Sequence, residues 1–223
     1  MLWEVEKENM LETLKDFFNE ELNETEFIPT YFEVRYGMKH LDFQESEIST
    51  EKPFPLKIGE KTVNLMGRID RIDLTKDGKR ARVRDYKTGR VFAKPNEFQG
   101  GTTLQLPLYL YAARQLLGPL HKGIQVESAE YYSLKDGKVF PFEGSQLDER
   151  ESELQEILKT IAVGIEEGVF IPYPDDQNCK YRYCDFRIIC GPWTQILFNR
   201  KSKDPRVKRY LEMAKEETEE GEE

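Results

Sequence analysis

Three charged residues that suit metal-ion chemistry, Asp70, Asp85 and Lys87, lie in the stretch GRIDRIDLTKDGKRARVRDYKTG, which covers residues 67 to 89. Carboxylates are hard oxygen ligands of the kind that Mg²⁺ prefers, and a lysine ammonium beside them can stabilise negative charge. The chemistry that this trio would support is metal-assisted hydrolysis. Whether the three side chains meet depends on how the stretch folds.

Asp77-Gly78, flanked by alternating polar and apolar residues, predicts a two-residue β-hairpin turn. With these two residues as the loop, opposed residues have numbers that sum to 155, so Asp70 falls opposite Asp85. Their carboxylates would then lie roughly 5 Å apart. The same face carries an apolar patch suited to a core, made of Ile72, Leu74, Ala81 and Val83.

Two opposed aspartates need a compensating positive charge, because like charges destabilise a sheet and burial raises the cost. A divalent cation is one candidate. The alternatives are a one-residue bulge that separates the pair, or neutralisation by Arg68 and Lys87, which fall opposite each other. The hairpin alone leaves these interpretations open. On the other face Asp73 falls opposite Arg82, which is interpreted as a structural ion pair.

The elements around this hairpin follow from hydrophobic periodicity and turn residues. The predicted fold is a mixed α/β (α+β) fold in which helices flank a central mixed sheet. Gln105 and Tyr109 are four residues apart and share one face of their predicted helix, which Thr102-Thr103 can cap. In chain order the pattern predicts an amphipathic helix over 1–22 that packs its apolar stripe, a strand over 27–36 that carries Glu33, a short hairpin over 56–65, a helix over 104–117, a second hairpin over 124–142 with Pro141 in an edge strand, and an amphipathic helix over 146–166.

The composition weighs against a simple DNA-binding surface, because 34% of the 223 residues are charged and the net charge is −9. Residues 212–223 hold seven Glu and one Lys, however, and so contribute −6 of that charge as a solvated tail. The basic stretch over 200–209 is interpreted as a solvated helix face paired with this tail, with nucleic-acid contact as the alternative.

The chain contains no run of 18 apolar residues and no apolar signal-peptide core, so we expect no membrane association and a cytoplasmic protein. Three cysteines are too few for a disulfide scaffold, which agrees with a reducing compartment. A nucleotide-handling ATPase is excluded because the chain contains no GxxxxGK[ST] loop.

The order and spacing of Asp70 in GRID, Asp85 and Lys87 in RDYKTG, and Gln105 and Tyr109 in LQLPLYLYA resembles the RecB/AddB-like branch of the PD-(D/E)XK nucleases. The resemblance covers about residues 30 to 195. It implies a restriction-endonuclease-like core and a metal-dependent DNA exonuclease or nuclease. The implied setting is a RecB/AddB-type helicase-nuclease of DNA repair and recombination that acts on single-stranded DNA or duplex ends.

For the residues, we expect Asp70, Asp85 and the backbone carbonyl of Tyr86 to hold Mg²⁺ or Mn²⁺. Lys87 would orient the attacking water, stabilise the transition state or accept a proton. The side chains expected to position the substrate or the lysine are Gln105, Tyr109 and Arg68, the last as a phosphate contact.

Cysteines near the C-terminus resemble the cluster-binding segment of related nucleases, in which the last three cysteines have spacings of x2 and x5. Cys184 and Cys190 reproduce the x5 step, but Tyr181 stands at the x2 position, Cys179 lies two residues too early, and no upstream cysteine exists. Three thiolates are fewer than the four that a cubane normally takes. A packing loop is therefore preferred over a four-iron four-sulfur cluster.

Family members also carry a His or Glu ligand on a helix before the first strands, and residues 1–22 contain no His. One explanation covers both gaps: the chain is the nuclease part of a longer helicase-nuclease or of a split gene, working with a helicase subunit or an upstream region. We therefore expect one nuclease-like domain over 1–195 that lacks its N-terminal helical part, followed by a basic and then acidic tail over 196–223. The alternative is a catalytically inactive DNA-binding or scaffold domain with the same fold.

Overall fold

The computed structural model describes residues 2–39, 46–89, 91, 97–171 and 187–219. Contacts divide the chain into two compact units, one formed by residues 1–98 and 102–152 and the other by residues 99–101 and 153–223. The domain boundary predicted near residue 195 stays a prediction. In the described part of the chain, no helix is both long enough and apolar enough to span a membrane.

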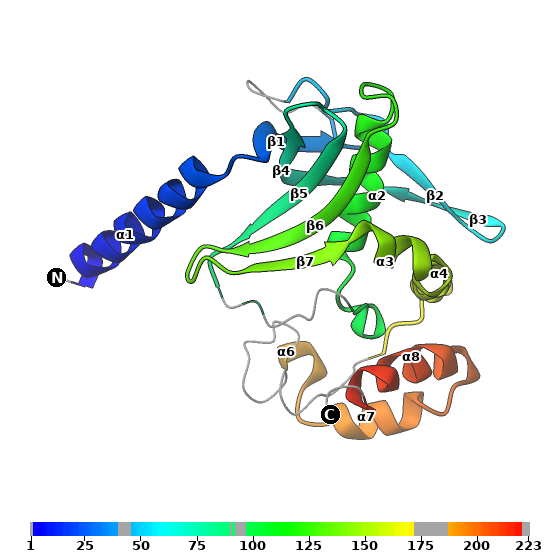
Figure 1. Cartoon of the computed structure of the whole chain (residues 1–223). Coiled ribbons are helices and arrows are strands. Elements are labelled where there is room, and N and C mark those ends of the chain that lie inside the picture. The colour runs from blue at the N-terminus through cyan, green and yellow to red at the C-terminus, as the bar shows by residue number, and fades with distance from the viewer. Residues whose placement is uncertain (1, 40–45, 90, 92–96, 172–186, 220–223) are drawn as a thin grey trace. The chain divides into compact units, whose positions relative to one another are not determined.

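The first unit is built on a central mixed sheet, as predicted. This sheet has five strands in the order β1-β4-β5-β6-β7, and β2 and β3 form a separate two-stranded sheet (Figure 1). Its elements are α1 (Leu2–Asn23), β1 (Phe27–Tyr36), β2 (Phe54–Ile58), β3 (Lys61–Leu65), β4 (Gly67–Thr75), β5 (Arg80–Lys87), α2 (Gln105–Leu117), β6 (Gln125–Ser133), β7 (Val139–Glu143) and α3 (Gly144–Glu149).

The central hairpin β4–β5 has the predicted register, since Ile72 pairs with Val83 and Asp73 with Arg82. Its turn is longer than predicted, because the strands end at Thr75 and Arg80 and leave four residues between them. The turn closes through a hydrogen bond from the Gly78 amide to the Thr75 carbonyl (2.8 Å), and the positive φ of Gly78 (67°) suits a glycine. The sum of the paired residue numbers is unchanged, so every side chain keeps its predicted face.

The ladder between β4 and β5 runs from Leu74 and Ala81 only as far as Arg71 and Arg84. The predicted opposition of the two site aspartates therefore lies one pair beyond its end. From there β5 continues alongside β6, with which it pairs in parallel as far as Lys87 and Ser133. β7 is an edge strand, as its proline predicted.

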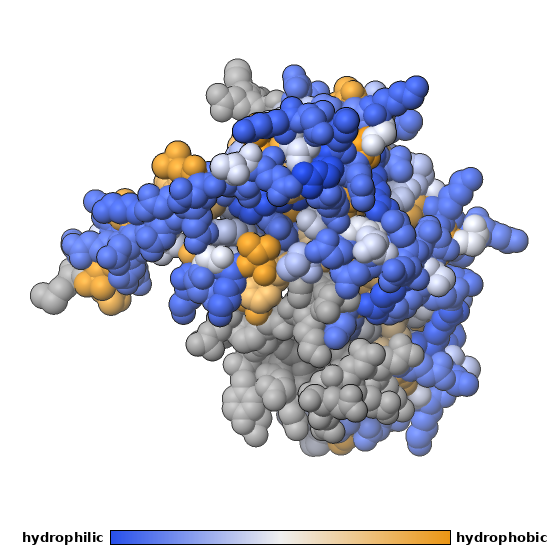
Figure 2. Space-filling model, in the orientation of Figure 1, coloured by the Kyte–Doolittle hydropathy of each residue, from blue (hydrophilic) through white to orange (hydrophobic). Residues whose placement is uncertain are grey.

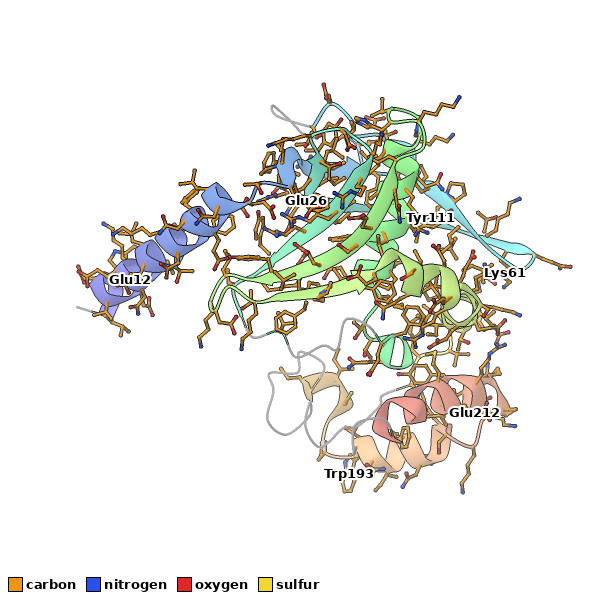
Figure 3. The ribbon with its side chains drawn as sticks, in the orientation of Figure 1. Glu12, Glu26, Lys61, Tyr111, Trp193 and Glu212 are labelled. Carbon is orange, nitrogen blue, oxygen red and sulfur yellow. The ribbon has the colours of Figure 1, made fainter. Side chains whose placement is uncertain are left out.

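Helix α2 lies on one face of the sheet and provides the main apolar core (Figure 1). Leu106, Leu110 and Leu117 of the helix are fully buried, as are Ile72 and Val83 of the hairpin. The N-cap position of α2 is Leu104, one residue after the predicted threonines, and the Leu104 side chain makes no capping hydrogen bond. Tyr111 of α2 also donates a hydrogen bond to the Pro55 carbonyl (2.8 Å), which ties β2 to the helix (Figure 3).

The opposite face of the sheet buries charged side chains instead of hydrocarbon. Asp73 is 0% exposed and lies between Arg71 and Arg82, with 2.9 Å from Arg82 Nε to Asp73 Oδ2. Arg84 donates to Glu130 of β6 (2.7 Å). The predicted ion pair of Asp73 and Arg82 is thus present, but it belongs to a buried network.

The last turns of α1 supply the missing carboxylates of this network. Glu21 lies 2.6 Å from Arg71 Nη1 and 2.7 Å from Arg84 Nη1. Glu24, which follows the helix, lies 3.1 Å from Arg82. Helix α1 is therefore held to the sheet mainly by ion pairs, supplemented by edge-to-face contacts of Phe17 with Tyr86 and Tyr132.

The prediction that α1 packs its apolar stripe holds only at Phe17, which is half-buried against Tyr86 and Tyr132, and no residue of the helix is fully buried. Its apolar side chains remain at the surface along the helix (Figure 2). At 100° per residue, Glu21 lies on the same side of the helix as Phe17 and the earlier apolar residues. The sheet meets this side only near the end of the helix, through Phe17 and Glu21, so the apolar residues before them stay exposed. The exposed stripe residues are Trp3, Met10, Leu14, Phe18 and Leu22.

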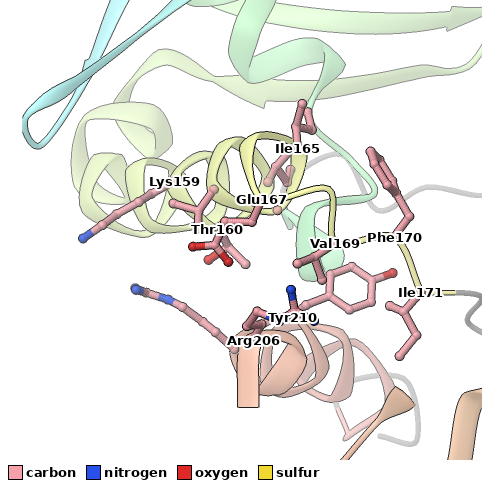
Figure 4. Close-up of a pocket in the computed structure, with 13 residues that line it drawn as sticks. Lys159, Thr160, Ile165, Glu167, Val169, Phe170, Ile171, Arg206 and Tyr210 are labelled. Carbon is pink, nitrogen blue, oxygen red and sulfur yellow. The ribbon is translucent and has the colours of Figure 1, made fainter. Parts of the chain in front are cut away.

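The predicted helix over 146–166 forms two helices that meet at Arg150, α3 and α4 (Glu151–Glu166). The second unit contains most of α4 together with η1 (Gln99–Gly101), α6 (Arg187–Cys190), α7 (Thr194–Lys201), η2 (Pro205–Val207) and α8 (Lys208–Glu219). A pocket of about 440 Å³ is lined by residues of α4, η2 and α8, and by Phe170 and Ile171 after α4 (Figure 4). It contains none of the predicted site residues.

Candidate active site

Asp85 is the buried centre of the candidate site. It lies near the end of β5 on the face that α2 covers, and it is 3% exposed. Asp70 of β4 is close enough for its charge to raise the pKa of Asp85, and Asp70 Oδ2 accepts a hydrogen bond from the Tyr86 amide (3.3 Å). The structure thus brings the two predicted aspartates together just beyond the end of their ladder, where the strands no longer pair.

Gln105, in the first turn of α2, connects the other predicted residues. Its Nε2 donates to Asp85 Oδ1 (2.8 Å) and to the Tyr109 hydroxyl (3.0 Å), while its Oε1 accepts from Lys87 Nζ (3.1 Å). The spacing of four residues brings Gln105 and Tyr109 to one side of the helix, which faces the sheet as predicted. The side-chain amide of Gln105 therefore holds the Asp85 carboxylate, the Lys87 ammonium and the Tyr109 hydroxyl together.

Lys87 lies beside Asp85, with 2.6 Å from its Nζ to Asp85 Oδ2. Its ammonium also lies 4.8 Å from the centre of the Tyr131 ring, which belongs to β6. The sequence did not single out Tyr131. Only the parallel register, in which Asp85 pairs with Tyr131, sets this ring next to the site.

The backbone of Tyr86 points toward β4. The Leu134 amide donates to the Lys87 carbonyl (2.9 Å), so that carbonyl points toward β6. Backbone groups of successive strand residues point to alternate sides, and the amide and carbonyl of one residue share a side. The Tyr86 carbonyl therefore points toward β4, the side on which its amide meets Asp70.

Arg68 lies at the rim of the site and is half exposed. Its Nη1 lies 3.0 Å from Glu33 Oε2. Burial raises the pKa of the Tyr109 hydroxyl, and the positive charge of Arg68 opposes this rise. Glu33 has a positive φ (52°), which is unusual for a residue other than glycine, and it interrupts the pairing of β1 with β4 at the position facing Asp70. The predicted pairing of Arg68 with Lys87 is absent, because the ladder between β4 and β5 ends at Arg71 and Arg84. On their other edges, Arg68 pairs with Arg35 of β1 and Lys87 with Ser133 of β6.

The cysteine segment cannot be placed, since Cys179 and Cys184 lie outside the described residues. Cys190 ends α6 as a free thiol. Within the ranges that the structure describes, no three His, Cys, Asp or Glu side chains are grouped to hold a metal ion. The carboxylates that the structure brings to the candidate site are those of Asp70 and Asp85.

Burial raises the pKa of Asp85; the Lys87 ammonium and its hydrogen bond oppose this, and the charge of Asp70 adds to it. A raised pKa means that the ionised carboxylate costs stability above the ordinary aspartate range, and that this cost disappears below it. In a chelating buffer at pH 7, we expect Asp85→Asn to raise the free energy of unfolding, because it removes a charge that burial makes costly. Urea unfolding across pH should show the gain shrinking as the pH falls toward 4.

The control is Asp136→Asn. The pKa of Asp136 is lowered, chiefly by a hydrogen bond from Ser133, so this variant should lose stability at pH 7. An Asp85→Asn variant that is less stable than the wild type at pH 7 would contradict the assignment of a costly buried charge.

A family model described as the PD-(D/E)XK nuclease superfamily matches residues 2–191, which is most of the chain. The chain belongs to this superfamily. As a member of the PD-(D/E)XK nucleases, it has the mixed sheet with flanking helices that the motifs implied. The match also includes β4, β5 and α2, the elements that carry the candidate site.

Curated relatives of this PD-(D/E)XK protein are named as subunits of an ATP-dependent helicase/deoxyribonuclease. The protein from Symbiobacterium thermophilum is 34% identical over 125 residues, which is 55% of this chain and 10% of the relative. That from Thermoanaerobacter sp. (strain X514) is 31% identical over 146 residues, 64% of this chain and 12% of the relative. The protein from Carboxydothermus hydrogenoformans is 25% identical over 170 residues, which is 73% of this chain and 15% of the relative. The chain thus spans about a tenth to a seventh of the length of these relatives.

Proposed function

We propose that this chain is a nuclease domain that hydrolyses phosphodiester bonds of DNA with the help of Mg²⁺ or Mn²⁺. The observation that carries the proposal is the cluster of Asp70, Asp85, Lys87 and Gln105 in a PD-(D/E)XK family member. An acid pair, an ammonium and a connecting amide are more than the packing of a helix on a sheet requires.

The residues fit a hard divalent cation. Asp85 Oδ2 is buried and no hydrogen bond of normal geometry reaches it, although the Lys87 ammonium is close. Asp70, Asp85 and the Tyr86 carbonyl would offer oxygen ligands only, and Mg²⁺ commonly uses one or two carboxylates and keeps several waters. When bound, the ion would lower the pKa of a water molecule and neutralise charge on the phosphate.

The remaining side chains would prepare the site for the reaction. Gln105 holds Lys87 next to Asp85 and so fixes the ammonium where negative charge would develop. Tyr109, through its hydrogen bond with Gln105, would hold that amide in place. Arg68 has donors left beyond its contact with Glu33, and it would bind a phosphate of the strand.

The names of the relatives support a larger setting for this domain. We propose that it acts on single-stranded DNA or duplex ends within a helicase-nuclease of DNA repair, together with helicase regions or subunits. The cluster formed by Cys179, Cys184 and Cys190 remains the less favoured prediction, because its spacing departs from the family pattern.

The test is cleavage of end-labelled single-stranded and duplex DNA with Mg²⁺, Mn²⁺ or EDTA. We expect cleavage with either metal and none with EDTA. The same ions should raise the melting temperature of the wild type but not of Asp70→Asn, since a ligand that binds only the folded state stabilises it. DNA binding without cleavage, together with no thermal response to either metal, would favour the non-catalytic binding or scaffold domain.

A further inference from the structure

The Lys87 ammonium is contacted on three sides. Asp85 Oδ2 lies 2.6 Å from it, Gln105 Oε1 accepts from it at 3.1 Å, and the centre of the Tyr131 ring lies 4.8 Å away. We propose that Tyr131 is a positioning residue for the reaction, because its ring holds the Lys87 ammonium in the place where it acts. This inference rests on the proposed nuclease function.

The fold gives Tyr131 this position through the parallel pairing of β5 and β6. Tyr131 pairs with Asp85, so both side chains lie on the face that α2 covers, and Lys87 follows two residues later on the same face. Tyr131 is 6% exposed, so its ring is fixed by packing. The next residue, Tyr132, points to the opposite face, where it contacts Phe17 of α1.

A lysine needs such support more than an arginine would. Its charge is a strongly hydrated point at the end of a flexible chain, and the Lys87 side chain is 35% exposed. An aromatic ring attracts the ammonium through its electron-rich face without accepting a proton from it. Gln105 accepts one of the three N–H donors and Asp85 pairs with the charge, so the ring adds a further contact to the ammonium while a donor remains for the substrate.

The role belongs to the ring and not to the hydroxyl. The contact that carries the inference joins the ammonium to the centre of the ring, at 4.8 Å. Phenylalanine presents a similar ring face. Leucine fills a comparable space without one.

The experiment compares Tyr131→Phe, Tyr131→Leu and Tyr132→Leu in metal-dependent DNA cleavage, with kcat expressed per mole of folded protein. We expect Tyr131→Leu to lower kcat by about tenfold with KM within about twofold, and Tyr131→Phe to keep most of the wild-type kcat. Tyr132→Leu is the packing control: it removes an equally buried tyrosine of the same strand and should lower the melting temperature while kcat is kept.

A second measurement does not depend on activity. After reductive ¹³C-methylation of the lysines, the Lys87 methyl resonance should be shifted upfield by the ring of Tyr131, with Lys87→Arg providing the assignment. The shift should persist in Tyr131→Phe and vanish in Tyr131→Leu. A Lys87 resonance that does not change in Tyr131→Leu would overturn the inference even if the wild type proved inactive.

The kinetic outcomes separate the two proposals. A wild type that fails to cut with any metal refutes the nuclease function. An active wild type refutes the role of Tyr131 if Tyr131→Leu keeps its kcat, if Tyr131→Phe loses as much as Tyr131→Leu, or if Tyr132→Leu loses as much as both.

Discussion

Asp85→Asn is expected to reduce metal-dependent DNA cleavage by about 10³-fold or more while the protein stays folded. The substitution keeps the shape of the side chain and its place beside Gln105, but removes the charge that would bind the cation. Loss of several kcal/mol of charge stabilisation corresponds to a rate loss of this size. Initial rates on end-labelled DNA at saturating Mg²⁺ provide the measurement.

The stability expected for this variant sharpens the test, because the removed charge is costly in the metal-free protein. A variant that is inactive yet at least as stable as the wild type cannot owe its defect to unfolding. The matched control is Asp148→Asn, which changes an exposed aspartate paired with Arg114 and should keep full activity. Activity of Asp85→Asn within tenfold of the wild type would refute the assigned site.

Asp73→Ala is expected to destabilise the protein by about 3 to 5 kcal/mol. Asp73 is fully buried and pairs with both Arg71 and Arg82, so its removal leaves two guanidinium groups without their central partner. The midpoint of urea unfolding should fall markedly. Far-UV circular dichroism and intrinsic fluorescence would report the transition.

The comparison that isolates burial is Asp148→Ala, which breaks an aspartate-arginine pair of similar chemistry at the surface. Exposed pairs contribute about 0 to 1 kcal/mol, so this variant should unfold nearly as the wild type does. Equal losses in the two variants would show that the network around Asp73 adds nothing beyond an ordinary surface pair.

The parts of the site that the sequence predicts are those set by local rules. The Asp77-Gly78 turn and the alternation around it determine which residues of β4 and β5 face each other, and this register survives a turn two residues longer than expected. The four-residue spacing of Gln105 and Tyr109 does the same within one helix. Neither inference needs knowledge of any distant residue.

The parts that the sequence does not predict depend on partners far away in the chain. Tyr131 meets Lys87 through a parallel register that no turn specifies, since α2 lies between the two strands in the chain. From the hairpin alone, Asp73 and Arg82 resemble a solvent-exposed ion pair. Glu21 and Glu24 of the N-terminal segment pair with arginines of the same network and make it a buried one. The unusual backbone of Glu33 was equally hidden, because nothing in the residue type requires a positive φ.

The attachment of α1 has a consequence for how this helix responds to its surroundings. The helix is attached to the sheet by ion pairs of Glu21 and Glu24 with arginines, and it buries little apolar surface against the sheet. Because Arg71 and Arg84 are buried, salt screens these ion pairs only weakly, and the desolvation penalty of such pairs diminishes on warming. The attachment of helix α1 is therefore expected to tolerate high salt and to become relatively stronger at elevated temperature.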